Sequence, residues 1–213
     1  MARILVIGAS RGIGRETVKR GLEVGHSIRA MSRGASDLGI SDPNLEPFAG
    51  DATDRDSVEK ALQGMDAVIQ SLGIRVTPQT WLGPVSLFSQ ATEVLVAAME
   101  ANGPRRLLAV TGIGSGDSRT ALSSLENLAK DFAMGAIYRD KSLQETMIRN
   151  SGLDWTIVRP TFLTRGARTG RYHAFAEPGT WRSGLISRAD VADFLIREVE
   201  SEAYLHRAPV LAY

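Results

Sequence analysis

The sequence predicts an α/β fold in which a doubly wound, mostly parallel sheet is flanked by helices. Short apolar runs that suit buried strands alternate along the chain with longer stretches of helical periodicity. Alternating elements of this kind specify parallel strands joined by helical crossovers. The chain has 213 residues, with neither a linker-like tract nor an internal repeat. We therefore expect residues 1–213 to form a single domain.

The first half of the chain is expected to hold four strands and two helices. The strands are the apolar runs at residues 4–7, 27–31, 46–49 and 67–70. The helices are expected at residues 12–24 and 57–62. Asp54 and Asp56 stand at the start of the second helix, where the positive end of the helix dipole favours acidic side chains.

The second half of the chain continues the alternation. Helices are expected at residues 88–101, in a region that ends at Asn150, and at residues 191–200, with strands at 106–110 and 155–158. Asn102-Gly103-Pro104 is a helix-stop signal, and Ser187 to Asp190 has capping-box spacing before the last helix. The charges of this last helix are expected to form a solvated face, made of Arg188, Asp190, Asp193, Arg197 and Glu198.

Composition and charge exclude several classes of partner. The 25 basic and 24 acidic residues nearly cancel, so neither a nucleic acid nor a membrane is the expected main partner. The absence of cysteine excludes disulfides and thiolate metal sites, and it fits a cytoplasmic protein. His26, His173 and His206 have no metal-ligand spacing, so no metal is expected. The apolar run before Gly8 is too short for a signal peptide or a membrane span.

The most informative segment is the glycine-rich turn between the first strand and the first helix. Glycines permit a tight turn and let the backbone approach a pyrophosphate, while amides at the helix N-terminus supply hydrogen-bond donors. The spacing is Gly-x3-Gly-x-Gly, and a plain connecting turn is the alternative interpretation. The position of the turn favours a Rossmann fold that binds a nicotinamide dinucleotide. The expected cofactor contacts here are Gly8, Ser10, Arg11, Gly12, Ile13 and Gly14.

The end of the second strand indicates which dinucleotide is bound. An acid at this point would bind the free ribose hydroxyls, whereas a base would bind a 2′-phosphate. The sequence is Met31-Ser32-Arg33, and Arg11 in the glycine turn could add a second guanidinium to the same phosphate. We therefore expect NADP(H) in preference to NAD(H). Asp37 is a weaker candidate for a ribose ligand, and solvated arginines are the alternative interpretation.

Several segments together resemble the atypical short-chain dehydrogenase/reductase superfamily. They are the glycine turn, Gly50-Asp51-Ala52, Ser71-Leu72-Gly73 and the run Ser151 to Pro160, so the resemblance covers nearly the whole chain. Within the superfamily, the chain is similar to the NAD(P)H-binding group that includes biliverdin IXβ reductase (flavin reductase) and NmrA-like proteins. The resemblance implies that Asp51 and Ala52 flank the adenine. It also implies that Ser71, Leu72 and Gly73 line the nicotinamide-side ribose and the phosphates, and that the stretch Pro160 to Leu163, with Phe162, approaches the carboxamide.

The same resemblance implies a catalytic set of Thr111, Tyr138 and Lys141. The better-known branch of the superfamily has a Ser or Thr followed by a Tyr-x3-Lys pair, but the spacing here is Tyr-x2-Lys. A helix turns about 100° per residue, so this spacing predicts that Tyr138 points away from the position of a proton donor. Lys141 is expected to bind the ribose. Gly112 and Phe162 replace a serine and a histidine of biliverdin reductase, which weighs against tetrapyrrole reduction.

These observations favour an NADPH-dependent oxidoreductase that reduces a small, flat, conjugated acceptor such as a flavin or a quinone-like compound. Such hydride transfer is mostly cofactor chemistry and needs no strong acid. A non-catalytic NmrA-like sensor of NADP(H) is the alternative, and a sugar-nucleotide epimerase is a third. A monomer and a homodimer both remain open.

The loops after strands four, five and six are expected to surround the acceptor, because ligands of open α/β sheets bind beyond the carboxyl ends of the strands. Their aromatic and basic side chains suit a flat ring with an acidic tail. These side chains are Arg75, Trp81, Phe162, Arg165, Arg168 and Arg171. The tract 164–184 has no evident regular structure and is long enough to close over the acceptor as a lid.

Overall fold

The computed structural model describes residues 1–34, 38–74, 77, 83–122 and 124–213, with the backbone alone at 124–133. Asp37, Arg75 and Trp81, which the sequence proposed as ligand contacts, lie outside the described residues. The main sheet has eight strands in the order β3-β2-β1-β4-β5-β6-β10-β8. Every neighbouring pair is parallel except β10 with β8, which confirms the expected doubly wound, mostly parallel sheet of a Rossmann fold.

Six strands of this sheet, β1 to β6, lie close to the expected positions, whereas β8 and β10 were not expected. Their bounds are β1 Arg3–Ile7, β2 Ser27–Ser32, β3 Leu45–Ala49, β4 Ala67–Gln70, β5 Arg106–Val110, β6 Asp154–Pro160, β8 His173–Phe175 and β10 Val210–Ala212. A separate two-stranded sheet pairs β7 (Phe162–Thr164) with β9 (Leu185–Ser187) in parallel. Strand β7 comes directly after β6 in the chain, so this small sheet lies at the carboxyl edge of the main sheet.

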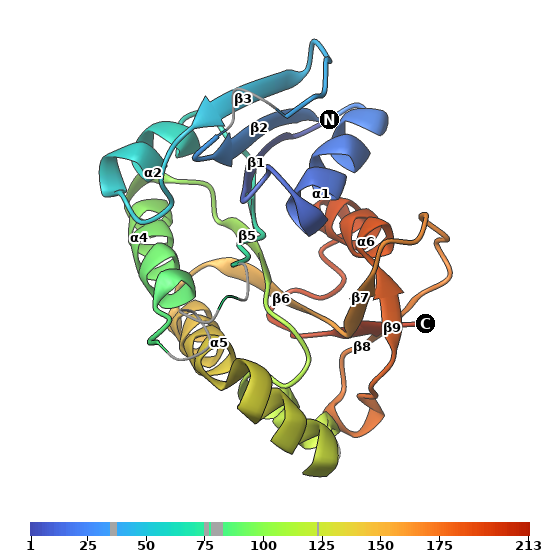
Figure 1. Cartoon of the computed structure of the whole chain (residues 1–213). Coiled ribbons are helices and arrows are strands. Elements are labelled where there is room, and N and C mark those ends of the chain that lie inside the picture. The colour runs from blue at the N-terminus through green and yellow to red at the C-terminus, as the bar shows by residue number, and fades with distance from the viewer. Residues whose placement is uncertain (35–37, 75–76, 78–82, 123) are drawn as a thin grey trace.

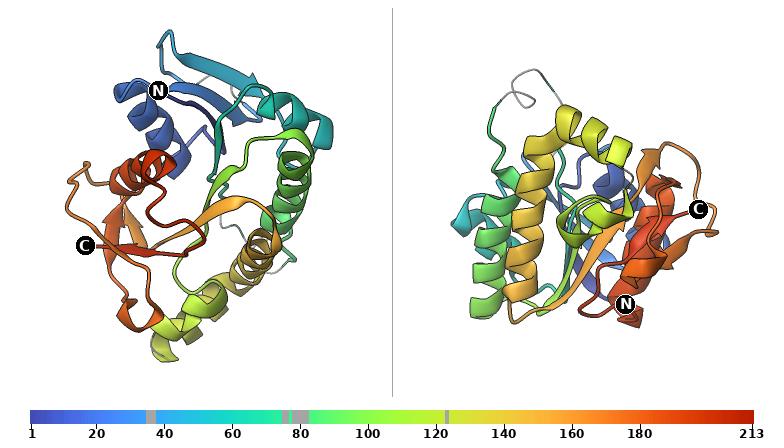
Figure 2. Two further views of the ribbon diagram at one scale, coloured as in Figure 1. Left: turned by 180° about the vertical axis from the view of Figure 1, so that it is seen from behind. Right: turned by 90° about the horizontal axis from the view of Figure 1, so that it is seen from below.

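Helices cover both faces of the sheet (Figures 1 and 2). Their bounds are α1 Gly12–Glu23, α2 Arg55–Leu62, α4 Leu87–Asn102, α5 Ser124–Asn150 and α6 Arg188–Ser201, with short 3₁₀ helices at Gly116–Ala121 and Pro178–Thr180. Helices α1 and α6 lie side by side on one face, whereas α2, α4 and α5 cover the other. The helix expected to end at Asn150 is long and bends at Met134, where the backbone is not helical.

Alternation along the strands explains the two layers of core. In β1, Ile4 and Val6 pack toward α1 and α6, while Leu5 and Ile7 pack toward α2 and α4. A parallel strand covered on both faces is apolar throughout, which is why the run 4–7 reads as continuous in the sequence. None of the described helices is long and apolar enough to cross a membrane.

The strand order reverses direction between β1 and β4, and this reversal opens a crevice at the carboxyl ends of the strands. The glycine turn lies at this point. The Gly8 amide donates to the Met31 carbonyl oxygen at 3.0 Å, and the Ser71 amide donates to the Ile7 carbonyl oxygen at 2.8 Å. The fold therefore brings the ends of β1, β2 and β4 together around the turn.

The structure corrects the expectation that the tract 164–184 lacks regular structure. The segment contains β8, which pairs antiparallel with β10, with Phe175 opposite Val210. It also contains the 3₁₀ helix at Pro178–Thr180. The partner strand of β8 lies near the end of the chain, so a local pattern of residues could not indicate the pairing.

The expected solvated face of α6 is also wrong in part. Asp190, Asp193 and Glu198 are buried, whereas Arg197 is exposed. Each buried carboxylate has a partner from another element. Arg20 of α1 donates to Asp193 at 2.9 Å, and Arg106 of β5 donates to Glu198 at 3.0 Å. Buried charges need such partners, and tertiary packing brings most of them from other elements.

Candidate functional site

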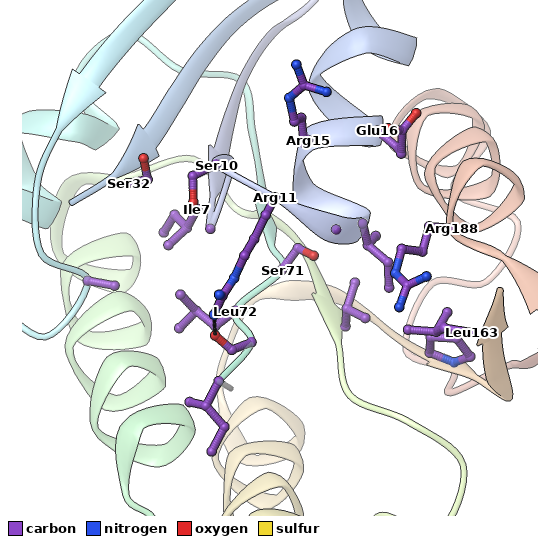
Figure 3. Close-up of a pocket in the computed structure, with 18 of the residues that line it drawn as sticks. Ile7, Ser10, Arg11, Arg15, Glu16, Ser32, Ser71, Leu72, Leu163 and Arg188 are labelled. Atoms are coloured by element: carbon purple, nitrogen blue, oxygen red, sulfur yellow. Dashed lines mark hydrogen bonds between the residues drawn. The ribbon is translucent and has the colours of Figure 1, made fainter. Parts of the chain in front are cut away.

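A cleft of about 2370 Å³ crosses the carboxyl ends of the central strands (Figure 3). It is larger than the roughly 300–1,000 Å³ of most small-ligand pockets. Most residues that the sequence proposed for cofactor binding or catalysis line it. They are Gly8, Ser10, Arg11, Gly12, Ile13, Arg33, Asp51, Ala52, Ser71, Leu72, Gly73, Thr111, Tyr138, Lys141 and Pro160. Gly14 and Phe162 are not among the lining residues.

The glycine turn has the geometry that only glycine allows. Gly8 has a φ of +89°, and a Cβ there would lie 2.4 Å from the Ser71 carbonyl oxygen. A Cβ at Gly14 would lie 2.2 Å from the Gly8 carbonyl oxygen, so Gly14 is needed for close packing of α1 on the turn, not for lining the cleft. Gly12 has a φ of +61° and faces open space. A side chain at Gly12 would therefore intrude on the cleft itself.

The N-terminus of α1 is open to an anion. Its N-cap residue is Arg11, whose side chain caps no amide, and its first turn contains no acid. Helices α2 and α6 differ, because Asp54 caps α2 and Ser187 caps α6. Uncapped amides at a helix N-terminus, together with the helix dipole, form a binding site for phosphate.

Polar side chains at the ends of β2 and β3 form one end of the cleft. The Ser32 hydroxyl is buried and, within the described part of the chain, has no hydrogen-bond partner. Asp51 accepts from the Thr53 amide at 2.9 Å and from the Thr53 hydroxyl at 2.8 Å, and these bonds, with the nearby charge of Arg33, lower the pKa of its carboxyl. Sequence reasoning missed Ser32 and Thr53, although each adjoins a residue that it proposed.

Arg11 does not join Arg33 at this end of the cleft. Its guanidinium donates to the Gly73 carbonyl oxygen at 3.3 Å, and the side chain extends toward Leu72, away from Ser32 (Figure 3). The expectation of two guanidinium groups on one phosphate is therefore not met in this conformation. Arg11 instead crosses the cleft between the glycine turn and the loop after β4.

The opposite end of the cleft is built around Lys141. Its ammonium donates to the Thr111 carbonyl oxygen at 2.5 Å and lies 4.9 Å from the centre of the Phe88 ring. Burial lowers the pKa of Lys141 to about 8, and the charge of Glu145 partly opposes this shift. The Thr111 hydroxyl donates to Glu145 at 2.7 Å, so that hydroxyl is already engaged.

Tyr138 lines the same cleft as Lys141, and its being out of register for a proton donor stays a prediction. A Cβ at Gly112 would lie 3.4 Å from the Tyr138 hydroxyl oxygen. Three residues along a helix amount to a rotation of about 300°, so Tyr138 and Lys141 lie within about 60° of each other on one face. Burial raises the pKa of the Tyr138 hydroxyl, so it holds its proton more firmly than a free tyrosine.

Beneath this end lies a buried charge cluster that sequence reasoning missed. Arg159 of β6 is fully buried and donates from Nε to Glu145 at 3.0 Å. Its guanidinium also pairs with Asp117 and lies 5.1 Å from the centre of the Trp181 ring. Glu145 also accepts a hydrogen bond from the Thr111 hydroxyl. The cluster therefore fixes Thr111, whose carbonyl oxygen accepts from Lys141.

The residues around the end of β6 lie only partly as expected, since Pro160 and Leu163 line the cleft but Phe162 does not. Phe162 is 55% exposed, whereas Leu163 lines the cleft, because successive residues of a strand face opposite sides. Arg168 lines the cleft but pairs with Glu23 at 2.9 Å, and Arg171 does not line it. Of the three arginines expected to bind an acidic tail, Arg165 alone both lines the cleft and lacks a partner in the described part of the chain.

These features fit a nicotinamide dinucleotide. The turn lets a phosphate approach the backbone, and the first turn of α1 has no acid to repel it. Ser32 at one end has a hydroxyl with no hydrogen-bond partner among the described residues. Lys141 supplies a cation at the other end.

Comparison with known proteins agrees with this geometry. The sequence model of a family described as NAD(P)H-binding matches residues 8–202. A reductase of (4-alkanoyl-5-oxo-2,5-dihydrofuran-3-yl)methyl phosphate from Streptomyces griseus is 30% identical over 162 residues, which is 76% of this chain and 48% of that protein. The chain thus spans about half the length of this relative.

Solved structures show the same fold. ChuY from Escherichia coli O157:H7, described as an anaerobillin reductase, is 26% identical and has a TM-score of 0.80, with 99% of this chain and 96% of that chain covered. A short-chain dehydrogenase/reductase from Veillonella parvula, solved in complex with NADP, is 16% identical and has a TM-score of 0.83, with 100% and 94% covered.

Proposed function

The chain belongs to the NAD(P)H-binding family, and from this premise we propose that it is an NADPH-dependent reductase of a flat, conjugated acceptor such as a flavin or a quinone-like compound. The observation that carries the proposal is one continuous cleft with an open helix N-terminus at its centre and Lys141 beside an apolar wall at one end. Two relatives are named reductases, and we extend that class of activity, but not their substrates, to this chain.

The residues near Lys141 support a reaction that needs orientation more than acid catalysis. Bound reduced nicotinamide supplies the hydride itself. Lys141, held by the Thr111 carbonyl oxygen, can donate to a ribose hydroxyl with its remaining protons. Pro160 lies near Gly112 and lines this end of the cleft, which gives it an apolar surface.

Neither hydroxyl at this end is prepared to act as a strong acid. Thr111 already donates to Glu145, and the pKa of Tyr138 is raised by burial. An acid-catalysed carbonyl reduction would favour a tyrosine with a lowered pKa. A conjugated acceptor needs less help, because its ring system spreads the negative charge that hydride brings. This contrast favours a flavin or a quinone-like compound over a simple aldehyde.

The end of β2 supports NADPH as the preferred reductant. Arg33 lines the cleft where a ribose-binding acid would stand in an NAD-specific site, and Ser32 offers a hydroxyl beside it. Asp51 is also at this end, but its oxygens accept two bonds from Thr53. The volume of the cleft leaves space for an acceptor next to the cofactor.

The test is NADPH oxidation measured with riboflavin, flavin mononucleotide and a water-soluble quinone as acceptors. We expect at least one acceptor to be reduced with one NADPH consumed per two electrons transferred. The Gly12→Ala variant, which should bind NADPH about ten- to a hundredfold more weakly, is the control and should need a correspondingly higher NADPH concentration for the same rate. NADPH binding without reduction of any acceptor would contradict the proposal and favour the non-catalytic sensor.

A further inference from the structure

Arg188 lines the cleft, and sequence reasoning assigned it no role there. It is the first residue of α6, and its guanidinium donates from Nη1 to the Thr164 carbonyl oxygen at 2.8 Å. A guanidinium has five N–H donors, so most of its donors remain available. No carboxylate in the described part of the chain forms an ion pair with Arg188. Figure 3 shows its side chain beside Leu163, extending from α6 toward the N-terminus of α1.

Helix α1 packs against α6, and the first residue of each, Gly12 and Arg188, lines the same cleft. The helices approach closely, since a Cβ at Gly21 would lie 3.3 Å from the Ile196 Cδ1 atom. Arg20 and Asp193 join them by an ion pair of 2.9 Å. The N-terminus of α1 has neither a cap nor an acid in its first turn, whereas α6 has both Ser187 and Asp190.

A basic residue at the N-terminus of a helix is electrostatically unfavourable, because the helix dipole is positive at that end. Arg188 places its positive charge at the N-terminus of α6, and its side chain extends toward the N-terminus of α1. Neither Asp190 nor Glu16 forms an ion pair with it. Asp190 accepts from Thr169, Gly170 and Tyr213, and Glu16, which lines the cleft, pairs with Lys19 at 2.9 Å.

We propose that Arg188 binds the diphosphate bridge of the dinucleotide from the side opposite the glycine turn, and so determines affinity for NADPH and NADH alike. Anion binding would compensate the unfavourable position of this charge. The bond to Thr164 holds the guanidinium in place beforehand, which lowers the entropic cost of binding. Arg33, at the other end of the cleft, would distinguish the two cofactors, whereas Arg188 would not.

The test compares Arg188→Ala with the matched control Arg171→Ala, an exposed arginine that does not line the cleft. Loss of one charge-assisted contact should raise the dissociation constants of both NADPH and NADH by about ten- to a hundredfold. Binding of 2′-AMP, which has the 2′-phosphate but no diphosphate, should stay unchanged. Arg171→Ala should bind all three as the wild type does.

Two further measurements separate this role from a structural one. Arg188→Lys keeps the charge and should recover part of the affinity, and the melting temperature shows whether Arg188→Ala still folds. The proposal is overturned if Arg188→Ala binds NADPH and NADH normally, or if 2′-AMP weakens by the same factor. Because only binding is measured, the result is independent of whether any acceptor is reduced.

Discussion

Replacing Gly12 with alanine should separate cofactor binding from stability. Gly12 has a φ of +61°, and no atom lies within 4 Å of the position of an added Cβ. The substitution should therefore lower the free energy of unfolding of the cofactor-free protein by about 1 kcal/mol, which is the cost of a left-handed backbone for a residue with a Cβ. For a chain of this size, that corresponds to a fall in melting temperature of about 2–4 °C.

The effect on NADPH should be larger. The added methyl group lies where a phosphate must approach the amides of α1, and each charge-assisted bond lost costs about 1.5–3 kcal/mol. The dissociation constant should therefore rise by about ten- to a hundredfold. Gly8 and Gly14 are unsuitable for this test, because a Cβ at either one would meet backbone atoms at 2.4 Å or less.

Gly25 offers the matched control. It has a φ of +89°, also has no atom within 4 Å of an added Cβ, and does not line the cleft. Gly25→Ala should lower the melting temperature by a similar amount and leave NADPH binding unchanged. Thermal unfolding and calorimetric titration of the two variants measure both quantities. If Gly12→Ala and Gly25→Ala bind NADPH equally well, the placement of the phosphate at α1 is wrong.

Three other predictions concern the two ends of the cleft. Arg33→Ala should weaken NADPH by about one to two orders of magnitude and leave NADH almost unchanged, and calorimetry showing equal loss for both would refute a 2′-phosphate contact. Tyr138→Phe should retain hydride transfer, because its hydroxyl has a raised pKa; a loss of about 10²-fold or more with normal NADPH binding would identify a general acid instead. Lysine is charged below its pKa, so the contribution of Lys141 to NADPH affinity should be present below pH 8 and fall as pH rises through about 8. Titrations across this range should show that Lys141→Met removes the fall, and an unchanged pH dependence in that variant would exclude Lys141 as its source.

Local patterns in the sequence were enough to predict the order of strands and helices from β1 to β6, the last helix and the position of the cleft, but not strands β7 to β10. Apolar alternation, the stop signal after residue 101 and the glycine turn each depend on neighbours a few residues apart. The carboxyl ends of parallel strands meet at one edge, so residues such as Gly8, Ser71 and Thr111 could be assigned to one site before the structure was known.

Contacts between distant segments determined which charged side chains are buried and which of them enter the cleft. The sequence predicted that Asp190 and Glu198 are solvated, but both are buried. Tyr213 donates a hydrogen bond to Asp190, and Arg106 donates one to Glu198. Arg11 binds the carbonyl oxygen of a residue 62 positions away, which no local pattern indicates. Arg188 enters the cleft only because α6 packs beside α1. The sequence determined which backbone could form, whereas tertiary packing determined which charges are paired, because a buried charge is stable only where a partner from another element meets it.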